Sequence, residues 1–391
     1  MGDNNRKRVR NSNVEALRLM AMLLVVFNHF LWNVDAILDG SQGADRYALL
    51  NALGILQNFG GVGDDLFFGI SAWFLCAENI SLKRDLKRTW VLERQLLFYS
   101  IVLFVISTGI WLRFGIGDFS WKTVAVDGVT SLFPIVTVRW WYPTSYVVFL
   151  LFHSWVDSAL RAFGRRTHRN LAVAMIIAWG IVPYYDIVGY SPLLFLYLYT
   201  VFSYVRWYMV DRISSPSATT RMIVIGLLLG IVSNIVAQFL SPNAPVLAVW
   251  MNKPRCIPSL LISLGLLVKV TQAKPRYSRV VNMFAGSTLA VYLMIGSMLP
   301  RYAAMACDAL GASGWMRYGE EFAVAVAFFC GGILIDLARR GLFAVTVDRR
   351  PGMWFEKVWT TVVQRDIFEA CVRRVDAALT GTSTKNHFKK G

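Results

Sequence analysis

The sequence predicts an all-α protein that crosses a membrane as a polytopic bundle of about ten helices, with both termini in the cytoplasm. Of its 391 residues, 56% are hydrophobic and only 16% are charged, whereas a soluble domain carries about 25% charged residues. Long apolar runs recur along the chain, and basic residues alternate between successive loops. The 14 Trp and 15 Tyr residues are typical of helices that end at bilayer interfaces.

A helix needs about 20 apolar residues to cross a hydrocarbon core of ~30 Å. Ten runs approach that length, at residues 14–33, 54–76, 96–113, 141–160, 171–189, 192–210, 222–240, 257–272, 282–300 and 321–338. Pro183 and Asp186 interrupt the fifth run, and the shorter apolar stretch 121–138 is predicted to be re-entrant or interfacial. The first run contains Glu15 and Arg18 and lacks a small-residue cleavage site, so we expect a span rather than a cleavable signal peptide.

The formal net charge of +16 has two possible sources, nucleic-acid binding or a topology with basic loops inside. Of the 40 Lys and Arg residues, 31 lie in loops on one side of the predicted spans and 8 lie on the other. This alternation is typical of a multi-pass protein of the cytoplasmic (inner) membrane. It accounts for the positive charge without a nucleic-acid partner, and makes the lipid bilayer the first expected partner.

The chain divides into three predicted parts. Residues 1–13 form a basic cytoplasmic N-terminus, residues 14–340 the transmembrane domain, and residues 341–391 a cytoplasmic tail. Apolar side chains recur at helical spacing in the tail, which predicts an amphipathic helix on the cytoplasmic leaflet; they are Trp354, Phe355, Val358, Trp359, Val362, Val363, Phe368, Cys371, Val372 and Val375. The five cysteines show no metal-binding spacing, so we expect isolated thiols and no metal.

Ionisable residues inside spans are expensive and indicate function. Arg18 and His29 stand 11 residues apart in the first span, so they project from nearly the same face with an axial separation of ~16 Å. Glu15 precedes Arg18 by one helical turn and is placed to pair with it. The alternative is that Glu15 and Arg18 extend to the interface as an ion pair, and that His29 is a structural hydrogen-bonding residue.

The second span carries Asp64 and Asp65 near its outer end, after a glycine-rich stretch. One of these carboxylates is a candidate to orient an imidazole in a catalytic site. The alternative is that one or both lie in interfacial water.

These two spans resemble the opening of the acyltransferase-3 family of integral membrane acyltransferases. The family typically shows an Arg-x10-His spacing, which Arg18 and His29 match, and a phenylalanine-rich second span, here FFGISAWFL, with Ala72 and Trp73 as departures. Weaker matches follow at Arg94, at Trp141 and Tyr142, and at Thr288, Tyr292 and Leu293; Ile295 stands where the family usually has His.

The resemblance covers roughly residues 11–340. It implies a ten-span bundle that uses cytoplasmic acyl-CoA, usually acetyl-CoA, to acylate a carbohydrate hydroxyl of a polysaccharide or glycolipid on the far side of the membrane. Acyl-CoA would be a co-substrate, and no metal cofactor is implied.

Acyl transfer to a sugar hydroxyl needs a base, donors for the oxyanion and a grip on the acyl donor. His29 is the best candidate base because imidazole titrates near neutrality, and His153 in the fourth span is a secondary candidate. Basic side chains on the cytoplasmic side are predicted to bind the CoA phosphates. The predicted donor-binding residues are Arg18, Arg94, Arg88 with its basic neighbours, and Glu15; the predicted acceptor-binding residues are Asn28, Ser71, Trp141 and Tyr142.

Two other functions remain open from the residues alone. A transporter of a glycan or small molecule would also have about ten spans and charged groups within the membrane. It would be expected to show related halves, whereas the polar groups here crowd into the first two spans. A catalytically inactive relative that exports or scaffolds glycan is the third possibility.

Overall fold

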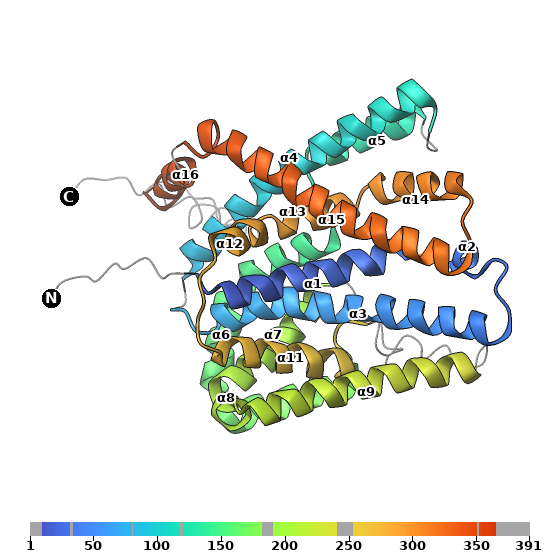
Figure 1. The fold of residues 1–391 in the computed structure, drawn as a ribbon. Helices are drawn as coiled ribbons and strands as arrows, with labels where there is room; N and C mark the ends of the chain where they lie inside the picture. Colours follow the sequence, from blue (N-terminus) through green and yellow to red (C-terminus); the bar gives the residue numbers. More distant parts are fainter. Residues whose placement is uncertain are drawn as a thin grey trace, which may run out of the picture. The chain divides into compact units, whose positions relative to one another are not determined.

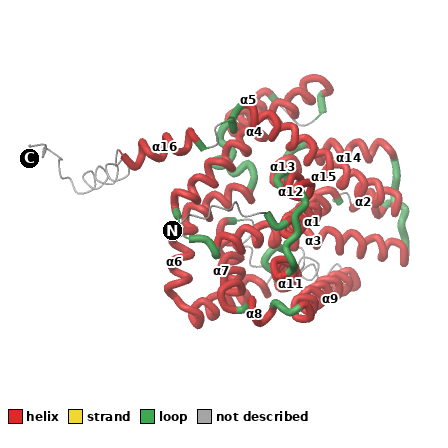
Figure 2. The backbone as a smooth tube through the Cα atoms, turned by 60° about the vertical axis from the view of Figure 1, so that its left-hand side comes forward, coloured by secondary structure: helices red, strands yellow, loops and turns green. Residues whose placement is uncertain are grey.

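The computed structural model describes residues 10–31, 34–79, 81–116, 120–181, 191–240, 253–349 and 352–364. Within these residues the chain is helical and contains no strand, which confirms the predicted all-α class (Figure 1). Figure 2, which colours helices red and strands yellow, accordingly shows no strand in the described part of the chain. The helices are α1 (Ser12–Phe30), α2 (Val34–Leu38), α3 (Gly43–Leu75), α4 (Leu82–Phe114), α5 (Trp121–Ser131), α6 (Trp141–Met175), the π-helix η1 (Ile176–Ile181), α7 (Pro192–Tyr208), α8 (Val210–Ile213), α9 (Pro216–Leu240), α11 (Ile257–Gln272), α12 (Arg279–Ala285), α13 (Thr288–Ile295), α14 (Leu299–Leu310), α15 (Gly314–Val345) and α16 (Met353–Gln364).

Five of the described helical segments are long and apolar enough to cross a membrane, which supports a multi-pass membrane protein. They lie at Ser12–Phe30, Leu82–Phe114, Trp141–Ile181, Pro216–Ala237 and Gly314–Val345. Arg279–Ile295 and Leu299–Leu310 form a sixth candidate, bent by 73°. The total of ten spans stays a prediction, and residues 182–189 of the fifth apolar run lie outside the described residues. Helix α5 has 11 residues, about 16 Å of rise, so it is too short to span alone.

The segment Trp141–Ile181 is a helical hairpin rather than one straight span. Gly164 inside α6 has φ 68° and ψ 171°, a conformation that glycine adopts without penalty and that stops a helix. Before this turn, His153 meets Tyr199 of α7 and Arg161 lies over Trp207. After it, His168 lies against Trp207, and Gly180 lies near Tyr197. The two halves of α6 therefore run in opposite directions along α7, as the separate apolar runs 141–160 and 171–189 predict.

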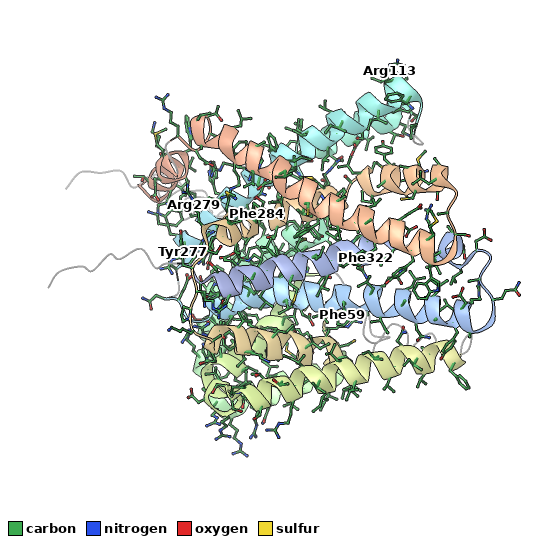
Figure 3. All side chains as sticks on the ribbon, viewed as in Figure 1. Phe59, Arg113, Tyr277, Arg279, Phe284 and Phe322 are labelled. Carbon is green, nitrogen blue, oxygen red and sulfur yellow. The ribbon has the colours of Figure 1, made fainter. Side chains whose placement is uncertain are left out.

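Helices α1 and α3 pack closely because small residues face the contact. A Cβ added to Gly63 would lie 2.6 Å from the carbonyl oxygen of Ala21, and one added to Gly60 would lie 2.5 Å from Asn28. Small residues let membrane helices approach and gain van der Waals contact. On another side of α1, Phe27 stacks on Phe322 of α15 with ring centroids 4.7 Å apart (Figure 3). This packing fixes the rotation of α1 and of the side chains it carries.

Most basic segments of the first compact unit, Met1–Ala338, gather at one end of it. At this end α1 begins, the α3–α4 and α11–α12 connections lie, and α8 leads into α9 (left in Figure 1). The Gly164 turn lies there too, because Arg161 donates to the Cys76 carbonyl oxygen at the end of α3 at 2.7 Å. We call this the basic end and the opposite one the far end; in Figure 3, Tyr277 and Arg279 mark the basic end and Arg113 the far end.

The second unit comprises residues 339–391, of which the structure describes the last turns of α15 and helix α16. Helix α16 forms part of the predicted amphipathic segment, and Phe355 stacks on Trp359 within it. Its location on a leaflet stays a prediction, and residues 365–391 lie outside the described part of the chain.

Candidate functional site

His29 lies in the last turn of α1, toward the far end of the first unit. Its Nδ1 lies 2.9 Å from the carbonyl oxygen of Val25, one turn earlier. A carbonyl oxygen only accepts, so Nδ1 carries the hydrogen in this bond. In the neutral ring, Nε2 then carries no hydrogen. Its lone pair can accept a proton, as a general base must.

A cavity of about 550 Å³ adjoins this imidazole. Its polar lining includes His29, Ser297, Arg301 and Glu321, from α1, the α13–α14 bend, α14 and α15. Ser297 donates to the carbonyl oxygen of Met294 at 2.5 Å. Glu321 accepts from Arg317 at 2.8 Å. The cavity therefore combines an imidazole, a guanidinium and apolar walls, a lining typical of small-molecule sites.

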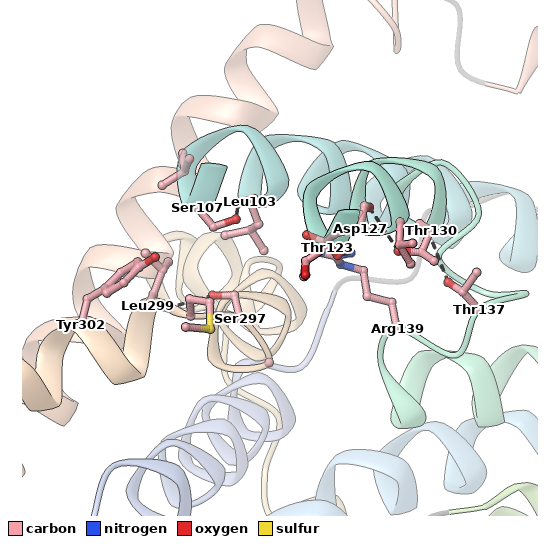
Figure 4. A pocket seen from close by; sticks show the side chains of 14 residues that line it. Leu103, Ser107, Thr123, Asp127, Thr130, Thr137, Arg139, Ser297, Leu299 and Tyr302 are labelled. Atoms are coloured by element: carbon pink, nitrogen blue, oxygen red, sulfur yellow. Dashed lines mark hydrogen bonds and ion pairs between the residues drawn. The ribbon is translucent and has the colours of Figure 1, made fainter. Parts of the chain in front are cut away.

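A second cavity of about 570 Å³ lies on the other side of the α13–α14 bend and shares Ser297 with the first. Figure 4 shows Asp127, Thr130 and Arg139 on one wall and Tyr302 on the opposite wall. Arg139 pairs with Asp127 at 2.7 Å. Both cavities thus meet at the bend between α13 and α14.

Arg18 and Glu15 form the ion pair that their spacing predicts, with Arg18 Nη1 3.0 Å from Glu15 Oε2. The Arg18 side chain is 26% exposed, whereas that of Glu15 is 9% exposed. The Arg18 side chain is therefore partly accessible, and Glu15 orients its guanidinium.

Tyr146 of α6 has three predicted site residues among its electrostatic neighbours. They are Ser71 of α3, Arg88 of α4 and Arg18 of α1.

Tyr142 and Trp141 lie in an aromatic cluster in the core of the bundle. Tyr142 packs against Phe67 at 5.5 Å, against Phe195 at 5.0 Å and against Tyr292 at 5.6 Å between ring centroids. Aromatic pairs of this geometry contribute about 0.5–1.5 kcal/mol each beyond their buried area. Tyr142 is only 5% exposed, so its main contribution in this structure is packing. Its electrostatic neighbours include Asp64 and Arg18.

Arg88 and Arg94 lie on the first half of α4. Arg88 pairs with Glu78 at 2.7 Å and with Asp85 at 3.0 Å, while Arg94 is partly buried. Burial raises the pKa of the Glu78 carboxyl, but hydrogen bonds from Arg88 and Arg84 outweigh it and leave the pKa below its ordinary value. Glu78 therefore stays ionised at neutral pH and holds the basic start of α4 against the α3–α4 loop.

Two predicted site residues, Asp65 and Asn28, form hydrogen bonds that join separate segments of the chain. Asp65 is fully buried and accepts from the backbone N–H of Arg255 at 3.2 Å. Arg255 has φ 104°, a rare conformation for a side-chain-bearing residue, so Asp65 stabilises the turn that precedes α11. Asn28 donates to the carbonyl oxygen of Gln57 at 2.7 Å and links α1 to α3.

His153 belongs to a buried polar network that extends from α4 through α6 to α7. Its Nδ1 lies 2.9 Å from Asp85 Oδ2, and its Nε2 lies 3.1 Å from the Tyr199 hydroxyl. Tyr199 donates to Asp157 Oδ1 at 2.6 Å, and Asp157 Oδ2 accepts from Arg161 at 2.7 Å. Asp85, His153, Asp157 and Tyr199 are each at most 4% exposed.

The bond from Tyr199 to Asp157 determines the direction of the bond between Tyr199 and His153. Tyr199 uses its hydrogen on Asp157, so its oxygen accepts and His153 Nε2 must donate. The other ring nitrogen, Nδ1, faces Asp85, so the imidazole links the Asp85 carboxyl group to the Tyr199 hydroxyl.

The sequence indicated His153 as a candidate site residue but gave no indication of its partners Asp85 and Tyr199. Asp157 follows His153 by one helical turn inside an apolar run, and that spacing could have been noticed because intramembrane carboxylates indicate function or pairing. Asp85 and Tyr199 gave no such local signal. Within the described residues, no group of His, Cys, Asp and Glu is arranged to hold a metal ion.

Comparison with known proteins gives one finding. A family model described as an acyltransferase domain matches residues 11–335. No curated protein and no solved structure gives a match.

Proposed function

The chain belongs to the acyltransferase-3 family, and from this premise we propose that it transfers an acetyl group from cytoplasmic acetyl-CoA to a hydroxyl of an extracytoplasmic envelope polysaccharide or glycolipid. The observation that carries this proposal is the position of His29. Its imidazole lines a 550 Å³ cavity toward the far end, on the helix whose basic-end half carries the Arg18–Glu15 pair.

The proposed reaction divides the bundle by function. Acetyl-CoA enters at the basic end, where Arg18, Arg88 and Arg94 bind its phosphates. Its flexible pantetheine arm extends along the bundle for the ~16 Å of α1 that separates Arg18 from His29. The acceptor glycan enters the cavity beside His29 from the far end.

His29 acts as general base in this mechanism. Nε2 takes the proton of the acceptor hydroxyl as its oxygen attacks the thioester carbonyl carbon. The tetrahedral oxyanion is stabilised by nearby donors, for which Arg301 is placed in the same cavity. When the carbon–sulfur bond breaks, the imidazolium returns its proton to the CoA thiolate, so the products are the glycan ester and CoA.

The test of this function is a donor assay with purified protein. We expect slow release of CoA from acetyl-CoA and faster release when an envelope glycan is added. A transporter would bind glycan without releasing CoA. Mass spectrometry of envelope glycans from a deletion strain identifies the acceptor. The acceptor is the glycan that lacks an O-acetyl group in that strain.

The proposed topology places the basic end in the cytoplasm. Reporter fusions after Gly40 and Ala312, which follow far-end helices, should report an extracytoplasmic location. Fusions after Arg166 and Lys274, at the basic end, should report a cytoplasmic one. A cytoplasmic signal at Ala312 would contradict this orientation.

Arg18 provides the test of the donor site. Arg18→Lys should weaken acetyl-CoA binding although it keeps the charge. A planar guanidinium can hydrogen-bond a phosphate and Glu15 at the same time, and lysine lacks that group. Arg18→Ala should weaken binding further. Isothermal titration of the folded variants measures the effect, and Arg221→Lys, at an exposed position of α9, is the matched control. Unchanged affinity in Arg18→Ala would leave Arg18 as an interfacial ion-pair residue.

A further inference from the structure

Four exposed arginines line an open cavity of about 790 Å³ at the basic end, and none of them belongs to the site described above. Arg165, Arg166 and Arg169 come from the start of the second half of α6, and Arg212 comes from α8. Val173, Tyr204 and Met209 complete its lining. The cavity exists because α6 reverses at Gly164 and brings its second half back along the end of α7.

The arginines of this cavity have no acidic partner among the described residues. The side chains of Arg165, Arg166 and Arg212 make no hydrogen bond or ion pair within that part of the chain, and the Arg169 side chain bonds the neutral side chain of Asn170. Other arginines of the bundle are paired: Arg161 with Asp157, and Arg317 with Glu321. Four guanidinium groups that share one cavity without a carboxylate repel each other, so an anion that enters is favoured.

An apolar surface continues from the cavity along the same helix. Arg165, Arg169 and Val173 recur at intervals of four residues, so they lie along one face of the second half of α6. Val173 is 47% exposed, and Ile177, four residues further on, is 56% exposed. A ligand with an anionic head and an apolar tail therefore matches this face, whereas a soluble phosphate would leave the apolar part uncovered.

The cavity lies apart from the proposed donor route. The seven residues that line the cavity include none of the proposed donor-binding residues. The buried ring of His168 lies against Tyr204 and Trp207 and holds the second half of α6 on α7.

We propose that this cavity binds the headgroup of an anionic phospholipid, with the phosphate among Arg165, Arg166, Arg169 and Arg212 and the acyl chains along Val173 and Ile177. Basic pockets between membrane helices on the cytoplasmic side recognise such headgroups. Because four guanidinium groups are present, a lipid with two phosphates binds more tightly than a lipid with one.

The test measures lipid binding to the purified full-length protein in detergent by native mass spectrometry. The probes are tetraoleoyl-cardiolipin, dioleoyl-phosphatidylglycerol and dioleoyl-phosphatidylcholine. We expect affinity to fall in that order. The variant Arg165→Gln/Arg166→Gln/Arg212→Gln should lose about 100-fold in cardiolipin affinity, since each basic residue near an anionic surface contributes about fivefold.

A matched control removes the same charge elsewhere at the basic end. Arg221→Gln/Arg276→Gln/Arg279→Gln changes three exposed arginines outside the cavity and should retain cardiolipin affinity. Equal loss in both triple variants, or no loss in either, would overturn the proposal. The phosphate could instead come from the nucleotide part of CoA, for which adenosine 3′,5′-bisphosphate is the probe. We expect that this nucleotide does not displace cardiolipin. Displacement by the nucleotide that is lost in the cavity variant would assign the cavity to CoA instead.

Discussion

Replacing His29 with alanine should lower acetyl transfer by roughly 10²–10⁴-fold, the usual contribution of a general base. The Nδ1 bond to the Val25 carbonyl oxygen leaves Nε2 as the basic atom toward the acceptor, and alanine supplies no such atom. His29→Gln should be almost as slow, because an amide cannot take up the proton. The measurement is CoA release from acetyl-CoA in the presence of glycan.

Two further measurements separate catalysis from folding in the His29 variants. Acetyl-CoA affinity should persist, because the proposed phosphate contacts lie at Arg18, Arg88 and Arg94. The wild-type rate should also fall at acidic pH, since a protonated imidazole cannot act as base. The matched control is His168→Gln, because His168 lies in α6 and hydrogen-bonds the Thr200 carbonyl oxygen at 2.9 Å, a contact that an amide can replace. Near-normal transfer by folded His29→Ala protein would exclude the base role.

The second large effect is expected on stability, from the buried network around His153. His153→Ala removes one hydrogen-bond partner from Asp85 and one from Tyr199, and a hydrogen bond to a charged group contributes about 1.5–3 kcal/mol. Asp85 keeps its pair with Arg88, so the loss comes from removing one contact to a side chain that is only 2% exposed and that water cannot readily reach. Denaturant titration in detergent, or the unfolding temperature followed by size exclusion, measures the loss.

A double-mutant cycle tests whether this loss comes from the pair. Asp85→Ala/His153→Ala should be more stable than the sum of the single losses implies, because residues in one network couple. Ser158→Ala, on the same helix, is the control: its hydroxyl donates only to the Ser154 carbonyl oxygen among its described contacts, so little stability should be lost. Additive losses at positions 85 and 153 would show that the two residues act separately.

Local pattern was sufficient to predict several features of this protein. Helix periodicity depends only on neighbouring residues, so the apolar runs, the shared face of Arg18 and His29, and the Glu15–Arg18 pair could be predicted directly. The family resemblance, carried by the Arg-x10-His spacing and the FFGISAWFL run, is confirmed by the match over residues 11–335. The roles assigned to individual site residues stay predictions.

Other features depended on which helices pack together. His153 and Asp85 are 68 positions apart, and His153 and Tyr199 are 46 apart, so no local spacing could pair them. The same holds for Asp65, whose contact with the backbone of Arg255, in the turn before α11, spans 190 positions. A sequence determines the faces of its helices, because a face repeats every few residues. The cavity at His29 and the arginine cavity at the Gly164 turn were decided by tertiary packing, since each joins side chains from helices that no short-range pattern places side by side.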